Sequence, residues 1–253
     1  ENHAALDLKE TLTQSKNAFD FESEIISPRG TKRTPVRRLI AVDKDFCRLA
    51  GYYLAEGHTN NRDAIGFTFH KQEREYIEEV TTLIKKVFGI HKEPRMRLLG
   101  DSIELTFYSK VLCAAFAALF YASRERRNAS TKALPEWMLG LTAELHAELF
   151  KCWWRGDKGY TSSRILMNQM KIILLRLGII PSIYTDSKGK HKKRGRHYFK
   201  REKRIITARH HSYFINHLSF FNESRHLLEE KEFAHHKSKS SIRHGWIDDT
   251  YVY

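Results

Sequence analysis

The amino-acid sequence predicts an α+β protein built from two tandem repeats. Two short segments, 49–57 and 149–157, share one pattern, because each is apolar, carries small residues and ends at a carboxylate beside a glycine. Their acids, Glu56 and Asp157, lie about 100 positions apart, the length of a small domain. The elements expected after each segment follow a similar order. That order and the two segments, rather than residue identity, indicate an internal duplication.

The first segment lies at the end of an expected helix. Asp43 is a suitable N-cap for a helix that begins at about Lys44, because its carboxylate can accept hydrogen bonds from the first backbone N–H groups. Gly57 is expected to end this helix. The apolar positions between these limits recur at helical spacing: Phe46, Leu49, Ala50, Tyr53 and Leu54.

The rest of the first half predicts alternating strands and helices. Apolar residues that alternate with smaller ones predict a strand over 65–69. Apolar residues at helical spacing, followed by a glycine, predict a helix over 73–89. The pair Gly100-Asp101 predicts a hairpin turn, and an apolar run closes the repeat. The expected hairpin strands are 94–99 and 102–108, and the closing helix is 111–124.

The second half is expected to repeat this plan in an abbreviated form. Pro135 is expected to open the helix that carries 149–157, since proline suits the first helical position. The extended stretch after Asp157 is much shorter than the one after Glu56. The later expected elements are a helix over 167–179, strands around Ile183-Tyr184, Tyr198-Phe199 and 205–207, and a closing helix over 213–221.

Polar segments separate and flank the repeats. Residues 125–134 are basic and polar, which is typical of a linker. We therefore divide the chain into an N-terminal basic arm (1–35), a first repeat (36–128), a second, abbreviated repeat (129–222) and a C-terminal tail (223–253).

The composition favours nucleic acid as the partner. The chain of 253 residues has 44 Lys and Arg against 30 Asp and Glu, so a polyanion is the expected partner. The longest apolar run, 111–121, is too short to span a bilayer, so we expect no membrane association. The three widely spaced cysteines give no disulfide framework and are expected in the core. An intracellular location is consistent with this pattern.

The paired segments resemble the signature motifs of a known enzyme family. Segment 49–57 resembles the first motif of the LAGLIDADG homing endonucleases, in the form found in intein- and intron-encoded members, and 149–157 is similar to their second motif. Two positions depart from the pattern, since Cys152 and Lys158 stand where glycine is usual. The resemblance covers 36–222. It implies pseudo-twofold tandem αββαββα repeats, with saddle-shaped antiparallel sheets and a central two-helix interface.

The two acids are the expected metal ligands. If the motif helices pack together, Glu56 and Asp157 lie side by side at their ends, next to the backbone carbonyls of Ala55 and Gly156. Carboxylate oxygens suit hard divalent cations, which activate water and offset charge during phosphodiester hydrolysis. We expect Mg²⁺, with Mn²⁺ or Ca²⁺ able to replace it in binding. Considered alone, Glu56 would be an ordinary acid in a polar loop after a helix.

The resemblance also implies a basic or polar pair at the end of the strand after the first motif. His70 and Lys71 occupy that place, and Lys71 is expected to hold a water molecule or to offset phosphate charge. Alternatively, Lys71 only opens the helix at Glu73. Lys158 directly follows the second acid, and it is expected either to reach the same catalytic site or to contact a more distant phosphate.

DNA contacts are expected on the two sheets, where Arg, Lys and Asn side chains reach phosphates and base edges. The second half carries ten Lys or Arg in the 17 residues 188–204, for which a solvated loop or a nuclear-type address is the alternative. The candidate DNA-binding residues are Asn60, Asn61, Arg62, Arg95, Arg97, Lys188, Lys190, Lys192, Lys193, Arg194, Arg196, Lys200, Arg201, Lys203 and Arg204.

The resemblance implies a site-specific endonuclease for double-stranded DNA with a long target site, cutting both strands across the minor groove. We expect a monomer, because one chain carries both motifs. Two alternatives stay open: a non-cleaving maturase or regulator with the same fold, and an endonuclease domain from an intein. Splicing by this chain is not expected, because it begins with Glu1, ends with Tyr253 and contains no His-Asn pair.

Overall fold

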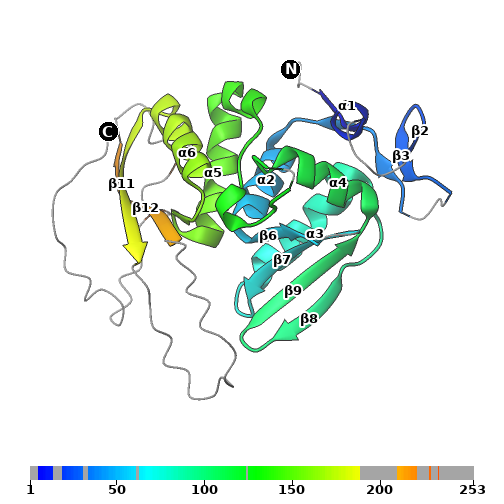
Figure 1. The fold of residues 1–253 in the computed structure, drawn as a ribbon, viewed down its shortest axis with the longest axis horizontal. Coiled ribbons are helices and arrows are strands. Elements are labelled where there is room, and N and C mark those ends of the chain that lie inside the picture. Colours follow the sequence, from blue (N-terminus) through cyan, green and yellow to red (C-terminus); the bar gives the residue numbers. More distant parts are fainter. Residues whose placement is uncertain are drawn as a thin grey trace.

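Two helices pack against each other at the centre of the structure. The computed structural model describes residues 5–13, 19–30, 34–60, 63–123, 125–188 and 210–220, together with Leu228 and Phe233. In it, α2 (Lys44–Glu56) and α5 (Ala143–Asp157) lie side by side, with an antiparallel sheet on either side of the pair (Figure 1). The predicted α+β class is confirmed.

The first repeat has the predicted order of elements. After α2 come β6 (Gly57–Thr59), β7 (Ala64–His70), α3 (Arg74–Phe88), β8 (Arg95–Leu99), β9 (Ser102–Tyr108) and α4 (Lys110–Leu119). The strands form an antiparallel sheet in the order β6-β7-β9-β8. Helix α4 ends at Leu119 rather than at 124, because the chain then enters a β-bridge between Tyr121 and Lys132.

Local sequence signals set the helix limits in this repeat. The Asp43 carboxylate accepts a hydrogen bond of 3.0 Å from the backbone N–H of Phe46, as an N-cap does. Gly57 follows the helix in an extended conformation. Gly89 ends α3 with a left-handed φ of 69°, which glycine adopts without steric strain. These limits place Glu56 at the very end of α2.

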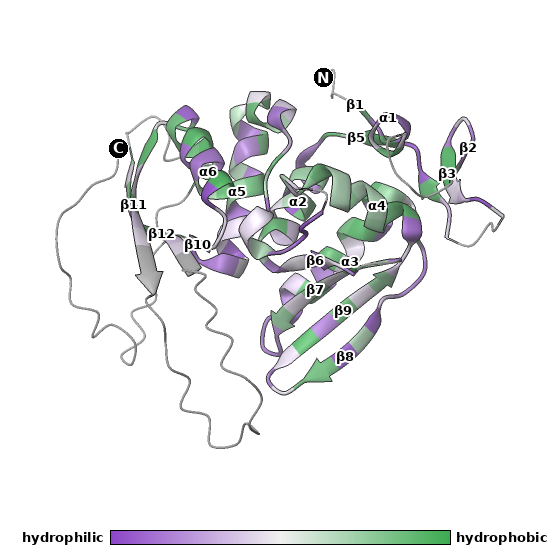
Figure 2. Cartoon of the chain, viewed as in Figure 1, coloured by the Kyte–Doolittle hydropathy of each residue, from purple (hydrophilic) through white to green (hydrophobic). Residues whose placement is uncertain are grey.

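Aromatic side chains pack one face of the sheet against the helices. Tyr53 of α2 meets Phe67 of β7 and Phe116 of α4, with ring centroids 5.8 and 4.6 Å apart. Its hydroxyl lies 3.1 Å from that of Tyr121, which satisfies both buried groups. Figure 2 shows α4 as a largely hydrophobic helix beside this cluster. The packing fixes α2, and with it Glu56, relative to the sheet.

The second repeat is shorter within the part of the chain that the structure describes. The 3₁₀-helix η2 (Glu136–Gly140) precedes α5, and β10 (Tyr160–Thr161), α6 (Arg164–Arg176), β11 (Ile179–Lys188) and β12 (His210–Phe220) follow it. The sheet order β10-β12-β11 corresponds to β7-β9-β8 of the first repeat. Strand β6 has no counterpart among the described residues of this half.

The prediction of one helix running from Pro135 through 149–157 is wrong. Pro135 instead precedes η2, and the backbone is extended at Leu141 and Thr142, with ψ of 166° and 162°. Helix α5 therefore begins only at Ala143. A proline that suits a helix start does not reveal that the chain leaves the helical conformation one turn later.

The predicted closing helix over 213–221 is also wrong, because these residues belong largely to strand β12, which pairs with both β10 and β11. The register shifts beside Ser182, so that Asn216 is an extra residue in the strand, a β-bulge. The bulge brings Ile215 and Leu218 to the same buried side. Their spacing therefore imitates that of a helix.

The N-terminal residues pack against the first repeat. They form β1 (Ala5–Asp7), α1 (Leu8–Leu12), β2 (Phe19–Phe21), β3 (Ile25–Pro28), β4 (Val36–Arg37) and β5 (Leu39–Ala41). Strands β2-β3-β4 make one small sheet, and β1 pairs with β5. Leu8 and Leu12 are buried where α1 packs against α4. The described part of the segment predicted as a basic arm is thus folded onto the body.

Several remaining expectations are confirmed, and others fall outside the described residues. Cys47, Cys113 and Cys152 are buried, as expected for core residues. Across the described ranges, no helix is both long enough and apolar enough to cross a membrane. The strands expected around Tyr198-Phe199 and over 205–207 lie outside the described residues.

The two central helices touch through small residues. A Cβ atom on Gly51 of α2 would lie 2.3 Å from the carbonyl oxygen of Leu149 and 2.9 Å from the Cβ atom of Cys152. At the helix ends, a Cβ atom on Gly156 would lie 2.6 Å from that of Ala55. Each of the two helices therefore contributes one glycine to the contact, which lets the backbones approach more closely than larger residues allow.

Polar side chains reinforce this contact beside the small residues. Arg48 of α2 forms an ion pair and a hydrogen bond with Glu148 of α5. Arg155 of α5 lies 3.5 Å from Glu79 of α3, which also accepts a hydrogen bond of 2.7 Å from the Tyr52 hydroxyl. The second motif helix is thus tied to two helices of the first repeat.

Gly51→Ala is expected to destabilise the protein by about 1–3 kcal/mol, because the added methyl group meets the backbone of α5 and forces overpacking. Urea titration would give the free energy of unfolding. Gly140→Ala is the matched control, since a Cβ atom there meets nothing within 4 Å. Equal stability of the two variants would show that the helices can separate without loss.

Candidate active site

The acids of both motifs lie next to each other at the ends of the central helices. Glu56 is the last residue of α2, and Asp157 is the last residue of α5. A Cβ atom on Gly156 would lie 3.2 Å from Oε1 of Glu56, so Glu56 packs directly against the end of α5. The structure therefore brings the two predicted ligands together, with the backbone of Ala55 and Gly156 beside them.

A buried lysine lies against the same end of α2. Lys132 follows the short 3₁₀-helix η1 (Ala129–Thr131). Its Nζ atom donates hydrogen bonds of 3.1, 2.8 and 3.0 Å to the carbonyl oxygens of Tyr53, Leu54 and Ala55. The last carbonyls of a helix lack partners within the helix and carry partial negative charge. Lys132 therefore caps α2 beside its terminal acid.

Burial shapes the protonation of these groups. Burial raises the pKa of Glu56 to about 6, a rise that Lys132 and Lys158 oppose and to which Glu73 adds. Burial also raises the pKa of Asp157 against the attraction of Lys132, and it lowers the pKa of Lys132 against the attraction of both acids. The site thus holds two acids with a single buried lysine, and an additional cation would favour their ionised forms.

Residues of both repeats hold Lys132 in place. The Ser163 hydroxyl donates a hydrogen bond of 2.6 Å to the carbonyl oxygen of Lys132, which also forms a β-bridge with Tyr121. Leu134 exchanges two hydrogen bonds of 2.8 Å with the side chain of Gln169. The prediction that residues 125–134 form a polar linker is therefore wrong, because the end of this stretch packs against both repeats.

The position of Lys132 is not evident from sequence patterns, because the residue stands in a basic, polar stretch. One signal is present. The residues that follow, Ala133 and Leu134, are apolar and buried, and a lysine at the edge of a buried segment needs a partner for its charge. No motif marks Glu73, whose charge also acts on the first acid.

The predicted basic residues differ in their relation to the acids. Lys158 acts electrostatically on the first acid, and its left-handed φ of 49° explains why glycine suits this position. Lys71 instead donates a hydrogen bond of 2.6 Å to Asp101 on the hairpin, and its side chain is half exposed. The His70 ring accepts a hydrogen bond of 3.3 Å from the backbone of Gln72. Only Lys158 among these three is brought to the acids.

One face of the first sheet forms a polar surface that begins at Glu56. Strand pairing places Arg97 of β8 opposite Glu104 of β9, and Glu104 opposite Thr68 of β7. The residue before Thr68 pairs with Gly57, so Thr68 lies level with Glu56. Side chains at paired positions project from the same face. The strands lie about 4.8 Å apart, so the three spacings from β6 to β8 place Arg97 roughly 14 Å from Glu56 across the sheet.

The described DNA-binding candidates have two different settings. The Asn60 side-chain oxygen accepts hydrogen bonds of 2.8 and 2.9 Å from the backbone of Asp63 and Ala64, so it shapes the turn before β7. Arg95 and Arg97 are exposed on β8. The other candidates lie outside the described side chains: Asn61, Arg62, Lys188, Lys190, Lys192, Lys193, Arg194, Arg196, Lys200, Arg201, Lys203 and Arg204.

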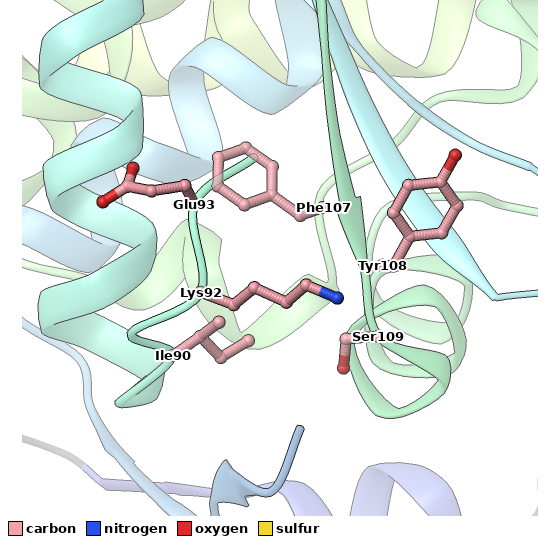
Figure 3. Close-up of a pocket in the computed structure, with 6 residues that line it drawn as sticks. All are labelled: Ile90, Lys92, Glu93, Phe107, Tyr108 and Ser109. Atoms are coloured by element: carbon pink, nitrogen blue, oxygen red, sulfur yellow. The ribbon is translucent and has the colours of Figure 1, made fainter. Parts of the chain in front are cut away.

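A cavity of about 230 Å³ opens beside the acids, where Lys132, Asp157 and Tyr160 line it. A much smaller cavity of about 10 Å³ lies between the loop after α3 and the end of β9, where Lys92 extends towards the strand that carries Tyr108 (Figure 3). The smaller cavity has room for no more than one water molecule. It shares no lining residue with the carboxylate site.

The two acids suit a divalent cation that is bound together with a substrate. In the described part of the chain, no three Asp, Glu, His or Cys side chains gather to hold a metal by themselves. Mg²⁺ is commonly held by one or two carboxylates, with water and substrate phosphates completing its ligands. The Ala55 carbonyl already accepts a hydrogen bond from Lys132, but its oxygen has a second lone pair. The donor set therefore fits.

Comparison with known proteins gives one domain match and several partial relatives. Residues 158–218 match the LAGLIDADG-like domain. Uncharacterized protein MJ0043 of Methanocaldococcus jannaschii is 36% identical over 222 residues, which cover 87% of this chain and 27% of the relative. The iron-sulfur cluster assembly SufBD family protein Rv1461 of Mycobacterium tuberculosis is 30% identical over 162 residues, which cover 58% of this chain and 19% of the relative. The DNA polymerase II large subunit of Thermococcus kodakarensis is 24% identical over 249 residues, which cover 86% of this chain and 13% of the relative.

The chain thus spans about a quarter or less of the length of these relatives. Among solved structures, variants of the homing endonuclease I-DmoI overlap 74% of this chain and 95% of their own, with a TM-score of 0.47 and 12% identity. I-DmoI in complex with DNA and Ca overlaps 70% and 84%, with a TM-score of 0.46 and 14% identity. Overlaps this loose establish nothing about this chain by themselves.

The domain match begins immediately after Asp157 and ends within β12, so it covers the sheet of the second repeat. The first repeat supplies the corresponding strands in the same order, and the two repeats meet at the motif helices. The resemblance seen in the sequence is confirmed. The chain contains a LAGLIDADG-like domain over residues 158–218.

Proposed function

We propose that this protein is a divalent-metal-dependent endonuclease that cuts double-stranded DNA at a specific site. One observation carries the proposal: Glu56 and Asp157 end two touching helices, with the buried ammonium group of Lys132 beside them. Isolated surface acids do not have raised pKa values or a buried cationic neighbour. Such perturbed groups gather where charge changes during a reaction.

The acids and the lysine divide the chemistry of hydrolysis. A divalent cation held by Glu56 and Asp157 would activate water and offset charge on the scissile phosphate when bound. The Lys132 ammonium places a positive charge in the same enclosed site, where it stabilises the added negative charge of the transition state. Lys158 is a second basic group at the edge of the site.

The polar face of the first sheet extends the site along DNA. Arg95 and Arg97 project from the edge strand β8. They lie on the same face of the sheet as the paired residues that extend from Arg97 towards Glu56. A separation of roughly 14 Å corresponds to about four base pairs of duplex, at 3.4 Å per step. We infer that these arginines contact DNA several base pairs from the cut. We also propose that the basic segment 188–204, which lies almost entirely outside the described residues, adds phosphate contacts.

Both acids come from one chain, which supports action as a monomer. The second repeat supplies Asp157 through α5, and the first supplies Glu56 through α2. No second copy of the chain is needed to complete the pair. A non-cleaving maturase or regulator would share the fold, but it would have no need for two partly buried acids beside a buried lysine.

The relatives favour an origin as the endonuclease domain of an intein. Similar stretches occur in a SufBD family protein and in the large subunit of a DNA polymerase, where they make up 19% and 13% of the length. These proteins share no activity by name, so a mobile insert explains the shared stretch better than a common function does. The target would then be the host gene without its insert.

Glu56→Gln and Asp157→Asn are each expected to abolish Mg²⁺-dependent cleavage while DNA binding remains. Each change keeps the shape of the side chain and removes a charged metal ligand. Cleavage would be measured on double-stranded DNA that includes uninterrupted host-gene junctions. Tight binding by the unaltered protein without cutting in Mg²⁺ or Mn²⁺ would reject the endonuclease and favour the maturase or regulator.

Lys132→Met is expected to slow cleavage by about 100-fold or more, because it removes a charge that stabilises the transition state. Lys71→Met is the matched comparison, since Lys71 pairs with Asp101 on the surface and is expected to change the rate by less than about tenfold. Single-turnover rates at saturating Mg²⁺ would separate them. A slower cleavage rate in Lys71→Met than in Lys132→Met would instead assign the role of basic catalytic residue to Lys71.

Arg95→Gln and Arg97→Gln are expected to weaken DNA binding. Each is also expected to reduce the slope of log K against log salt by about 1, because one phosphate is no longer neutralised by an arginine. Lys86→Gln is the control, since Lys86 lies on α3 and pairs with Asp45. Binding isotherms at several salt concentrations give the slopes. Unchanged slopes in both arginine variants would place the DNA elsewhere.

A further inference from the structure

Trp153 has a buried polar group whose purpose the fold alone does not explain. Its side chain is fully buried in α5, and the indole N–H makes no hydrogen bond within the described residues. A buried donor without an acceptor is unfavourable, so such groups are rare. Trp153 therefore has a feature that packing does not require, because apolar contacts need no N–H donor.

The indole lies beside the second acid. Trp153 precedes Asp157 by four residues in α5, and residues at this spacing lie on one face of a helix. Burial raises the pKa of Asp157, and the indole N–H of Trp153 is among the groups that lower it, in agreement with this placement. The N–H makes no hydrogen bond of normal geometry to this acid.

Packing prevents the indole from turning elsewhere. Its ring lies 5.7 Å from that of Phe150, at an angle of 49°. The backbone nitrogen of Trp153 would lie 2.9 Å from a Cβ atom on Gly51, so this part of α5 is held against α2. The N–H is thus fixed in direction, as a group that orients a neighbour must be.

We propose that Trp153 is a positioning residue for metal binding: its N–H holds one oxygen of Asp157 and leaves the other oxygen to face the cation. This inference rests on the proposed function. Groups that hydrogen-bond to a ligating carboxylate fix its orientation, and their loss commonly lowers metal affinity or activity by about 10–100-fold.

The first test uses Trp153→Phe, which keeps an aromatic side chain and removes the donor. The Mg²⁺ concentration for half-maximal cleavage is expected to rise by about 10–100-fold, with a smaller change in rate at saturating Mg²⁺. Trp154→Phe is the matched control in the same helix, since Trp154 is also buried but packs against Phe150 and Phe233. Its metal dependence is expected to stay within about threefold of the unaltered protein.

A second readout does not depend on cleavage or on the folding of the Trp153 variant. The chain has four tryptophans, so ¹⁵N-labelled indole groups give four N–H resonances, which single substitutions of the other three assign by elimination. Adding Mg²⁺ or Ca²⁺ alone is expected to shift the Trp153 resonance in the unaltered protein. The same addition is expected to leave it in place in Asp157→Asn.

The outcomes separate the two proposals. If the unaltered protein binds metal and cuts DNA, but Trp153→Phe has unchanged metal dependence or the Trp153 resonance does not move, the positioning role is wrong and the endonuclease stands. If the unaltered protein neither binds metal nor cuts DNA, the proposed function fails and the positioning role fails with it. A larger effect in Trp154→Phe would assign the loss to packing rather than to the donor.

Discussion

The close contact between α2 and α5 is the constraint on which the rest of the structure depends. Because Gly51 has no side chain, the backbone of α5 can lie directly against α2. The helix ends then meet, and Glu56 and Asp157 share one partly buried space. A wider separation would return both carboxylates to bulk water, where their pKa values would fall towards those of free acids. The chemistry of the site therefore follows from the packing of the helices.

Opposing charges make this site suitable for a polyanionic substrate. The chain carries a net charge of +14, which favours a polyanionic partner, yet its centre holds two acids that would repel phosphate. Lys132 offsets part of that negative charge and caps the carbonyls of α2 at the same time. A bound cation would offset the remainder. Lys132, together with such a cation, would offset the cost of placing two acids in a partly buried site.

The sequence predicts the first repeat well, because its signals are local. Caps such as Asp43 and the alternation of β7 depend only on nearby residues, and the motifs identify both acids. Features set by tertiary contacts are not visible in this way. Asn216 is a bulge only because β11 pairs beside it, and its presence makes a strand resemble a helix. Lys132 gains its place from carbonyls at Tyr53 to Ala55, which lie far away in the sequence.

The position of Lys132 also bears on how the protein unfolds. Its side chain bonds to α2, its carbonyl oxygen accepts a hydrogen bond from Ser163, and its backbone pairs with Tyr121. One residue is thus an integral part of both halves. Neither half can melt without leaving a buried ammonium group or a bare helix end in the other. The two halves are thereby linked, and we expect them to unfold together in a single transition.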